Sequence, residues 1–448
     1  MANSQLWTLH GDGRRLGPTD VVGPDERLAW GRTIGIGMQH IVAMFGATFL
    51  VPVITGMDPN TTIFFSGVGT LVFILATRGR GQRMGLPSYT GSSFAFISPV
   101  IASQTSGGIP SALFGIFAAG VVLFVVGLLV DRFGSRWINI AMPPAVTGAV
   151  VALIGLNLAP IAVANFAKQG AIAAVTLAVI VLCTVALPGF LGRISILLGV
   201  VVGYIMAAMM GQLDLKAWDA SHWVGAPHFQ APSISWRAVG LVVPVVIVLI
   251  AENTGHIKAV GSMTGRNLDG SLGRGYMGDG LATMLAGLGG GSGTTTYAEN
   301  IGVMAATRVY STAAYMVAGA TAILLSLIPK FGVLVNAIPI GVLGGATIVL
   351  YGLIAVLGGR IWVEGNVDFK NPVNLFPAAI GIIIGAADMK WKMGDLEFNG
   401  IAIGSIVCII AYHLMNYIAK VGPSKGALYQ APVFDEAPDG RSASSRRS

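Results

Sequence analysis

Apolar runs of about 20 residues recur along the chain from residue 30 to residue 422, and they restrict its fold more than any other feature. A bilayer core is about 30 Å thick, and roughly 20 apolar residues in a helix cross it. Because lipid offers no partners to backbone N–H and C=O groups, such runs must be helical. The ten-residue alternating pattern of outer-membrane barrels does not appear. We therefore expect an all-α polytopic membrane protein.

Composition excludes several other classes of protein. Of the 448 residues, 54% are hydrophobic and 10% are charged, whereas a soluble domain is about 25% charged. The net charge of +7 does not indicate nucleic-acid binding, because the Lys and Arg residues lie mostly at span ends rather than in one patch. Cys183 and Cys408 lie inside apolar runs and offer neither a disulfide framework nor metal-ligand spacing. We expect no metal and no cofactor.

Hydropathy predicts fourteen spans, several of them short and rich in Gly or Pro. Their ranges are 30–53, 59–78, 87–104, 109–131, 137–163, 170–188, 194–212, 237–257, 275–291, 293–308, 311–329, 336–359, 372–388 and 398–420. Residues 1–29 and 423–448 are polar and are expected to be solvated cytoplasmic tails. Residues 1–29 also lack the apolar region of a cleaved signal peptide.

The distribution of basic residues supports this span count. With both termini in the cytoplasm, 21 Lys and Arg residues fall on the inner side and six on the outer side. This asymmetry follows the positive-inside rule, and removing one span would invert every later loop. The longest polar connection, 213–236, carries three tryptophans and is expected to lie outside.

The two seven-span halves resemble each other. The third span opens with PSYTGSSFAFI (87–97) and the tenth with TTTYAENIGVM (294–304), and each places small and hydroxyl residues before a helical run. Pro143 and Gly148 in the fifth span are matched in spacing by Pro339 and Gly344 in the twelfth. Because seven is odd, the second copy crosses the membrane in the opposite sense. Paired broken segments in an inverted repeat indicate a transporter site near the bilayer midplane.

Two acidic residues lie inside predicted spans, namely Glu252 in the eighth and Glu299 in the tenth. A carboxylate at this depth costs about 2.5–3.5 kcal/mol on insertion scales, so it is by default a functional hypothesis. His256 shares a helical face with Glu252 and is a candidate proton relay. His40 is also intramembrane, with either a direct role or a structural hydrogen bond. Asp279 and Asp388 lie near span ends, where solvation or capping would account for them.

The expected site suits a flat, neutral ring. Half-helices beginning near Ser93, Phe94 and Glu299 would point their free N–H groups into the cavity. No Lys or Arg is expected there, so an anion would be neutralised only by helix N-termini. Carboxylates accept from N–H groups of a ring, backbone N–H groups donate to its C=O groups, and Phe94 covers one face. Nucleobases are such rings.

At these residues the sequence resembles the nucleobase–ascorbate transporter family, and within it the bacterial uracil and pyrimidine permeases, over about residues 30–420. The segments that carry this resemblance are QHIVAMFGAT (39–48), GSSFAFISP (91–99), AENTGH (251–256), MTGRN (263–267) and TTYAENIGVMAATRVYST (295–312). The family signature in the tenth span corresponds here to Glu299, Asn300, Gly302 and Thr307, followed by Arg308.

The resemblance implies an architecture of fourteen transmembrane segments in two inverted seven-span repeats, with short strands in spans 3 and 10. It implies a core domain (30–133 and 237–330) and a gate domain (134–212 and 331–422), separated by the extracellular connection 213–236. A homodimer through the gate domains is also implied. The protein would lie, multi-pass, in a bacterial cytoplasmic (inner) membrane.

The resemblance also assigns roles to individual residues. Phe94, Glu252, Ala298 and Glu299 would bind the substrate, and Glu252, His256 and Glu299 would couple the proton. Ala298 replaces a common Gly, which keeps the N–H group but adds a methyl group to the pocket. Tyr351 would line the boundary between core and gate. Possible supporting residues are His40, Ser93, Tyr297 and Tyr351.

The functional prediction is proton-coupled uptake of uracil by movement of the core against the gate. Sodium remains open as the coupling ion, because carbonyls and hydroxyls that bind it leave no clear spacing. One alternative is a purine (xanthine or urate) symporter with a different pocket. Another is an anion transporter or channel of the same architecture. A membrane enzyme is not expected, since the glycines at 287–293 lack the Lys-Ser/Thr ending of a phosphate-binding loop.

Overall fold

The computed structural model describes residues 6–17, 20–79, 83–105, 107–394 and 396–422. In this part of the chain the first half contains mostly helices, which are α1 (Trp30–Thr55), α2 (Pro59–Ala76), α3 (Ile97–Gln104), α4 (Gly108–Phe133), α5 (Arg136–Ala141), α6 (Pro144–Lys168), α7 (Gly170–Ala186), α8 (Phe190–Arg193) and α9 (Ser195–Met209). The connection between the halves contains one turn of helix, α10 (Ala217–Ala220).

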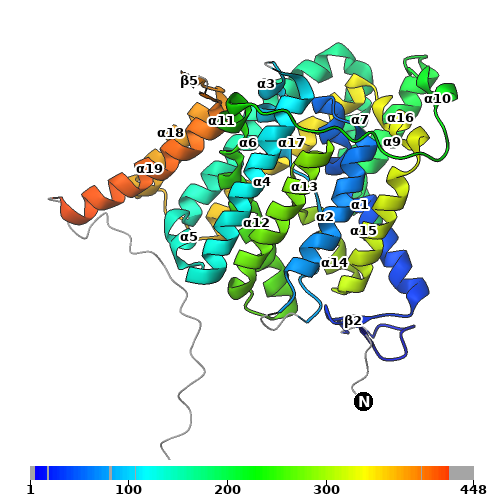
Figure 1. Ribbon diagram of the computed structural model, residues 1–448, viewed down its shortest axis with the longest axis horizontal. Coiled ribbons are helices and arrows are strands. Elements are labelled where there is room, and N and C mark those ends of the chain that lie inside the picture. The colour runs from blue at the N-terminus through cyan, green and yellow to red at the C-terminus, as the bar shows by residue number, and fades with distance from the viewer. Residues whose placement is uncertain (1–5, 18–19, 80–82, 106, 395, 423–448) are drawn as a thin grey trace, which may run out of the picture.

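The second half repeats this helical character. Its helices are α11 (Trp236–Val242), α12 (Val245–Thr264), α13 (Leu272–Gly289), α14 (Ala298–Thr307), α15 (Thr312–Ser326), α16 (Pro329–Asn336), α17 (Ile340–Glu364), α18 (Pro372–Ala386) and α19 (Gly400–Val421). Single 3₁₀ turns occur at Phe94–Phe96 and Asp269–Ser271. The helices run side by side in a broad bundle, from which α19 projects with its C-terminal end (Figure 1).

Six short strands form three two-stranded sheets, and they are β1 (Thr8–Leu9), β2 (Glu26–Arg27), β3 (Thr90–Ser92), β4 (Thr294–Thr296), β5 (Trp391–Met393) and β6 (Leu396–Phe398). The pair β1–β2 is parallel, whereas β3–β4 and β5–β6 are antiparallel. Among the strands whose burial the structure describes, β3 and β4 are buried along their whole length, and this pair joins the two halves of the chain.

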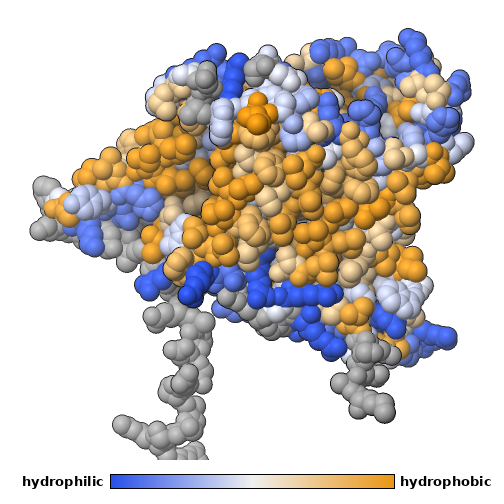
Figure 2. Space-filling model, in the orientation of Figure 1, coloured by the Kyte–Doolittle hydropathy of each residue, from blue (hydrophilic) through white to orange (hydrophobic). Residues whose placement is uncertain are grey.

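Helix length and hydropathy identify the membrane-crossing elements. Within the described residues, seven helices or joined helices are long and apolar enough to cross a bilayer, and they become eight if the pair α15–α16, bent by 87°, forms one span. Four further apolar helices are shorter, and include α7, α9 and α18. Apolar side chains cover the middle of the molecule, and hydrophilic residues lie above and below this band (Figure 2). Such a surface matches a lipid bilayer.

Glycines allow α4 and α13 to pack with their backbones in contact. They recur every seven residues on both helices, as Gly120 and Gly127 on α4 and as Gly273, Gly280 and Gly287 on α13. A Cβ atom added at Gly280 would lie 2.6 Å from the backbone nitrogen of Phe124. Small residues at helix contacts in membranes permit this close approach. The two helices therefore form a rigid pair behind the strands.

The N-terminal segment differs from the solvated tail that its composition predicts. Trp7, Val22 and Leu28 are at most 9% exposed, and Val22 pairs its backbone with Val309. The indole Nε1 of Trp7 donates to Thr312 Oγ1 at 2.8 Å. These few apolar side chains bind a mostly polar segment to the loop between α14 and α15. Residues 423–448, the second predicted tail, lie outside the described residues.

Candidate functional site

The site is organised around the strand pair β3–β4 and the helices that follow each strand. Thr90, Gly91 and Ser92 pair with Thr296, Thr295 and Thr294, and the ladder continues as Ser93 N–H donates to Gly293 O at 3.0 Å. After β3 the chain turns through a 3₁₀ turn into α3, and after β4 it enters α14 directly. Two helix N-termini therefore begin at the ends of one small sheet.

Helix α12 crosses beside the sheet and contacts the chain at both strands. Ser93 Oγ donates to Glu252 Oε2 at 3.4 Å. One turn later, His256 Nδ1 lies 2.9 Å from Thr296 Oγ1. Glu252 and His256 are both half-buried. The helix thus presents a carboxylate near the end of β3 and an imidazole at β4.

Glu299 and Ala298 occupy the first turn of α14. Both are accessible to solvent, whereas their neighbours Tyr297 and Asn300 are buried. Glu299 nevertheless lies deep among protein atoms and within electrostatic range of Glu252. A carboxylate that is accessible there can be reached by a ligand. The N-cap residue of α14, Tyr297, makes no side-chain capping bond, so N–H groups of the first turn have no cap that would compete with a ligand.

Two aromatic rings close one side of this region. Phe94 lies edge-to-face against Tyr351 of α17, with ring centroids 5.9 Å apart and an interplanar angle of 81°. Their exposed fractions are 9% and 2%. The Tyr351 hydroxyl has no hydrogen-bond partner within the described part of the chain. A ring for stacking and a buried hydroxyl therefore lie together where α17 meets the strand–helix turn.

His40 and Tyr297 lie in the scaffold of the site. His40 is fully buried, with its ring centroid 4.1 Å from that of Tyr315. Asn300 Nδ2 donates to His40 O at 3.0 Å and lies 3.1 Å from His40 Nδ1. The Tyr297 hydroxyl donates to Ser92 O at 2.9 Å and lies 3.0 Å from Thr48 Oγ1. These contacts hold α14 and β3 against α1.

A buried carboxylate supports β4, and the sequence analysis missed it. Asp279 was expected to be solvated or to cap a helix near a span end, but it is fully buried within α13. Its Oδ2 accepts from Asn253 Nδ2 at 2.8 Å, and its Oδ1 accepts from Thr294 Oγ1 at 2.9 Å. Thr296 Oγ1 donates to Asn253 Oδ1 at 3.1 Å.

These bonds form a continuous chain from Asp279 to His256 through Asn253 and Thr296. An acidic residue among glycines, seven residues into a helix, was the signal that could have identified it. Asp388 does act as a cap, as expected, because its Oδ1 accepts from the N–H of Gly400 at the start of α19, at 3.1 Å.

The arrangement favours hydrogen bonding to a neutral molecule. It combines two carboxylates, the free N–H groups of a helix start, and an aromatic pair. Neither Glu252 nor Glu299 forms a salt bridge within the described residues. The same residues contain no group of three His, Cys, Asp or Glu side chains placed to hold a metal ion. The site therefore has acceptors and donors but no cation to neutralise an anionic ligand.

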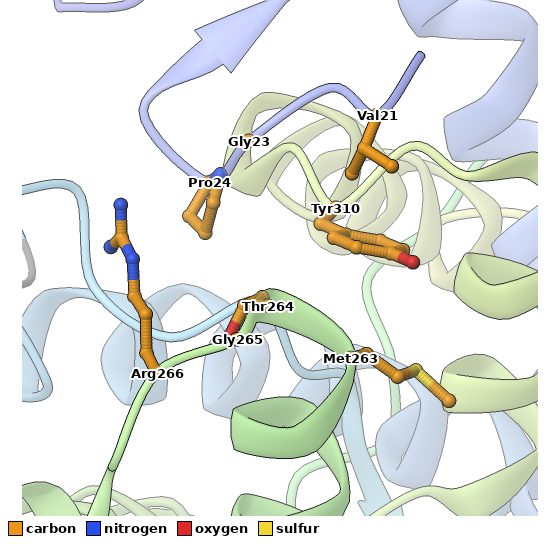
Figure 3. Close-up of a pocket in the computed structure, with 8 residues that line it drawn as sticks. All are labelled: Val21, Gly23, Pro24, Met263, Thr264, Gly265, Arg266 and Tyr310. Atoms are coloured by element: carbon orange, nitrogen blue, oxygen red, sulfur yellow. The ribbon is translucent and has the colours of Figure 1, made fainter. Parts of the chain in front are cut away.

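A separate hollow of about 290 Å³ lies at the opposite end of α12 from the connection 213–236. It is enclosed by the N-terminal segment, the end of α12 and Tyr310 (Figure 3), and its lining residues are Val21, Gly23, Pro24, Met263, Thr264, Gly265, Arg266 and Tyr310. None of the expected substrate-binding residues lines it, so it is separate from the site around the strand pair β3–β4.

The fold is similar to that of solved membrane transporters. It matches the murine anion transporter Slc26a9 in the inward-facing state with a TM-score of 0.66 and 12% identity, over 87% of this chain and 68% of that chain. It matches the transmembrane domain of the cyanobacterial bicarbonate transporter BicA with a TM-score of 0.57 and 15% identity, over 86% and 97%. At these identities the likeness concerns the fold alone.

The sequence is similar to bacterial permeases. It is 45% identical to the pyrimidine permease RutG of Escherichia coli (strain K12) over 428 residues, which cover 92% of this chain and 96% of that protein. It is 40% identical to the uracil permease of Bacillus caldolyticus over 406 residues, covering 86% and 92%. It is 38% identical to the uracil permease of Escherichia coli (strain K12) over 422 residues, covering 91% and 96%.

Apolar helices interrupted by a buried polar site, together with these bacterial relatives, define an integral inner-membrane protein of the transporter class. Family membership is more specific. A family model described as a permease family matches residues 31–394. The chain belongs to this family. Its members are permeases, which move solutes across a membrane rather than transform them.

Proposed function

We propose that the chain takes up uracil, or a closely related pyrimidine, together with a proton. The observation that carries this proposal is the meeting of Glu252, Glu299 and the first turn of α14 without a basic side chain. A pyrimidine ring has adjacent N–H and C=O groups, which match carboxylate acceptors and backbone donors. The uracil and pyrimidine permeases to which the chain is similar support the same substrate class.

The proposed architecture has fourteen spans in two inverted repeats, with β3 in the third span and β4 in the tenth. The segments 30–133 and 237–330 form the core domain, and 134–212 and 331–422 form the gate domain. Four apolar helices of 10 to 17 residues support the higher span count, because broken or tilted segments cross a membrane with fewer helical residues. Both termini lie in the cytoplasm, and two chains pair through their gate domains within the lipid.

Transport begins with protonation from outside. A proton on Glu252 or His256 lowers the negative charge of the site by one, and uracil then bridges Glu252 and Glu299 while Phe94 covers one face of its ring. The core moves against the gate, and substrate and proton leave on the inner side. One charge that crosses 100 mV releases about 2.3 kcal/mol, which supports roughly 50-fold accumulation of a neutral solute. Coupling requires protonation and substrate binding to favour each other.

Uptake of radiolabelled uracil into proteoliposomes with an imposed inward proton gradient tests the proposal. We expect accumulation that a protonophore abolishes and that does not depend on sodium. Unlabelled thymine, xanthine, urate and hypoxanthine serve as competitors. Transport of xanthine or urate in place of uracil would instead establish a purine symporter. Transport of an anion would favour the alternative suggested by the fold of the anion transporters. The two carboxylates argue against that alternative, because without a cationic partner they would repel an anionic substrate.

The substitution Glu252→Gln tests the coupling scheme. It keeps the shape of the side chain but removes the titrating group, so we expect proton-driven accumulation to be lost. Glu364→Gln is the matched control, because this carboxylate is exposed on α17 and, within the described residues, pairs only with Arg360. Normal accumulation by the Glu252→Gln protein would contradict the scheme.

A further inference from the structure

One ion pair crosses the boundary between the proposed core and gate domains. Arg237 opens α11, on the core side, and its Nη2 donates to Glu397 Oε2 of β6, on the gate side. Helix α11 packs against β6 around this contact. Figure 1 shows β5 of the same hairpin beside α11, at the end of the molecule that also carries α10. Since α10 lies in the connection 213–236, this is the proposed extracellular side.

The position of Glu397 explains why it has cationic partners. Only 7% of the residue is exposed, and a carboxylate in such a place needs a cationic partner to offset its lost hydration. Arg237 is one partner. Lys392 is the other, with its Nζ 3.5 Å from Glu397 Oε2. Lys392 stands directly opposite Glu397 in the β5–β6 ladder, so it moves with Glu397 wherever the hairpin goes.

Arg237 and Lys392 therefore behave differently when the core moves away from the gate. If the core separates from the gate, Arg237 leaves with the core and becomes free to enter water. Glu397 keeps Lys392 and is never left as an uncompensated buried charge. The ion pair therefore stabilises the contact between core and gate, and breaking it does not leave Glu397 without a cationic partner.

We propose that the Arg237–Glu397 ion pair is an extracellular latch, which stabilises the conformation in which core and gate touch on this side, while Lys392 retains Glu397 when the latch opens. The inference rests on the proposed division into core and gate. It adds two residues, outside the substrate site, that set the balance between the two ends of the transport cycle.

Thiol labelling from outside tests the latch without a substrate. Ser103 on α3 is fully buried, and α3 packs against both α11 of the core and α6 of the gate. A Ser103→Cys reporter, in a chain with Cys183 and Cys408 replaced by Ala, is treated with a membrane-impermeant maleimide in proteoliposomes. We expect slow labelling while the latch is closed. Arg237→Gln and Glu397→Gln should each speed labelling about five-fold. This factor corresponds to the upper end of the free energy that an ion pair between partly exposed side chains contributes.

Two controls separate a latch from general loosening. Lys392→Gln removes a charge from the same hairpin but breaks no contact across the boundary. Because Glu397 then has no cationic partner once the latch opens, labelling should be no faster than the reference rate. The double variant Arg237→Gln/Glu397→Gln should label no faster than either single variant, because both remove one contact. Reference-rate labelling of the Arg237→Gln protein would overturn the proposal, as would equal acceleration by Lys392→Gln.

This outcome is independent of the substrate assignment. If labelling responds as expected but uracil is not transported, the latch stands and the proposed substrate is wrong. If uracil is accumulated but neither variant changes the labelling rate, the proposed function stands and the latch is refuted.

Discussion

At the scale of single residues, the site is set by polar groups that hold one another rather than by the two glutamates alone. Asp279 lies in no motif, yet it fixes Asn253 and Thr294 and through them the strand that carries Thr296. Sequence reasoning found Glu252, His256 and Glu299 because a charge in an apolar run is conspicuous. It misjudged Asp279 because hydropathy places span ends only to within a few residues.

Replacing Asp279 with Asn tests this network. Both carboxylate oxygens accept hydrogen bonds, whereas an amide offers one acceptor and one NH₂ donor, so one donor would face another donor. We expect a loss of about 1–3 kcal/mol of stability, the usual effect of an unsatisfied buried group, seen as a lower Tm in detergent. Asp214→Asn is the control, because Asp214 is exposed and, in the part of the chain that the structure describes, pairs only with exposed Lys216. Equal Tm values for the two variants would contradict the assigned role.

At the scale of elements, the sequence predicted the helical segments well and their ends less well. The predicted span 237–257 is observed as two helices, α11 and α12, and the second continues to Thr264. The apolar run in the sequence ends where the lipid ends, but the helix and its backbone hydrogen bonds continue into the aqueous phase. The 87° bend between α15 and α16 lies directly before Pro329, which begins a new helix rather than continuing the old one.

Glycine positions were visible in the sequence, but their partners were not. The seven-residue spacing in α13 indicates a contact face, while the choice of α4 as its partner depends on tertiary structure. Sequence alone could not identify this pair, because many helices in this chain carry small residues.

The α4–α13 contact predicts opposite effects of the same substitution at two glycines. Gly280→Ala would place a methyl group against the backbone of Phe124 and should cost about 1–3 kcal/mol through overpacking. Gly352 of α17 has open space around it, so Gly352→Ala should be neutral or stabilising by up to about 1 kcal/mol through helix propensity. Thermal unfolding of the two variants in the same detergent compares them. A Gly280→Ala protein as stable as the parent would show that the helices are not in backbone contact.

At the scale of the whole molecule, the N-terminal segment joins regions that are distant in sequence. Thr312 Oγ1 donates to Pro24 O at 2.8 Å, and Asp25 Oδ1 accepts from the N–H of Met84 at 2.9 Å. The segment therefore contacts the ends of both halves on the side opposite the latch. Composition could not predict this, because a polar segment with three buried apolar side chains has the average character of a tail.

Substitutions at two neighbouring valines test whether one buried side chain anchors this segment. Val22 is fully buried against Leu28 and Val309, whereas Val21 is 41% exposed. Val22→Asp should release the segment, because a buried unpaired carboxylate is strongly unfavourable. Val21→Asp should leave the segment bound. Limited trypsin digestion at Arg14 and Arg15 reports release, and equal digestion of both variants would show that Val22 does not anchor the segment.

The strand pair β3–β4 also has a consequence in time. The hydroxyl of Tyr297 bonds Ser92 O across 205 residues of sequence, and a ribosome adds about 5–20 residues each second. Roughly 10–40 seconds therefore pass between synthesis of the first strand and arrival of the second. During this interval the backbone N–H and C=O groups of the three β3 residues lack their hydrogen-bond partners in β4. Lipid offers no partners in their place. The first half must shelter these groups with neighbouring helices, water or the insertion machinery, and the candidate site is completed only when the second half arrives.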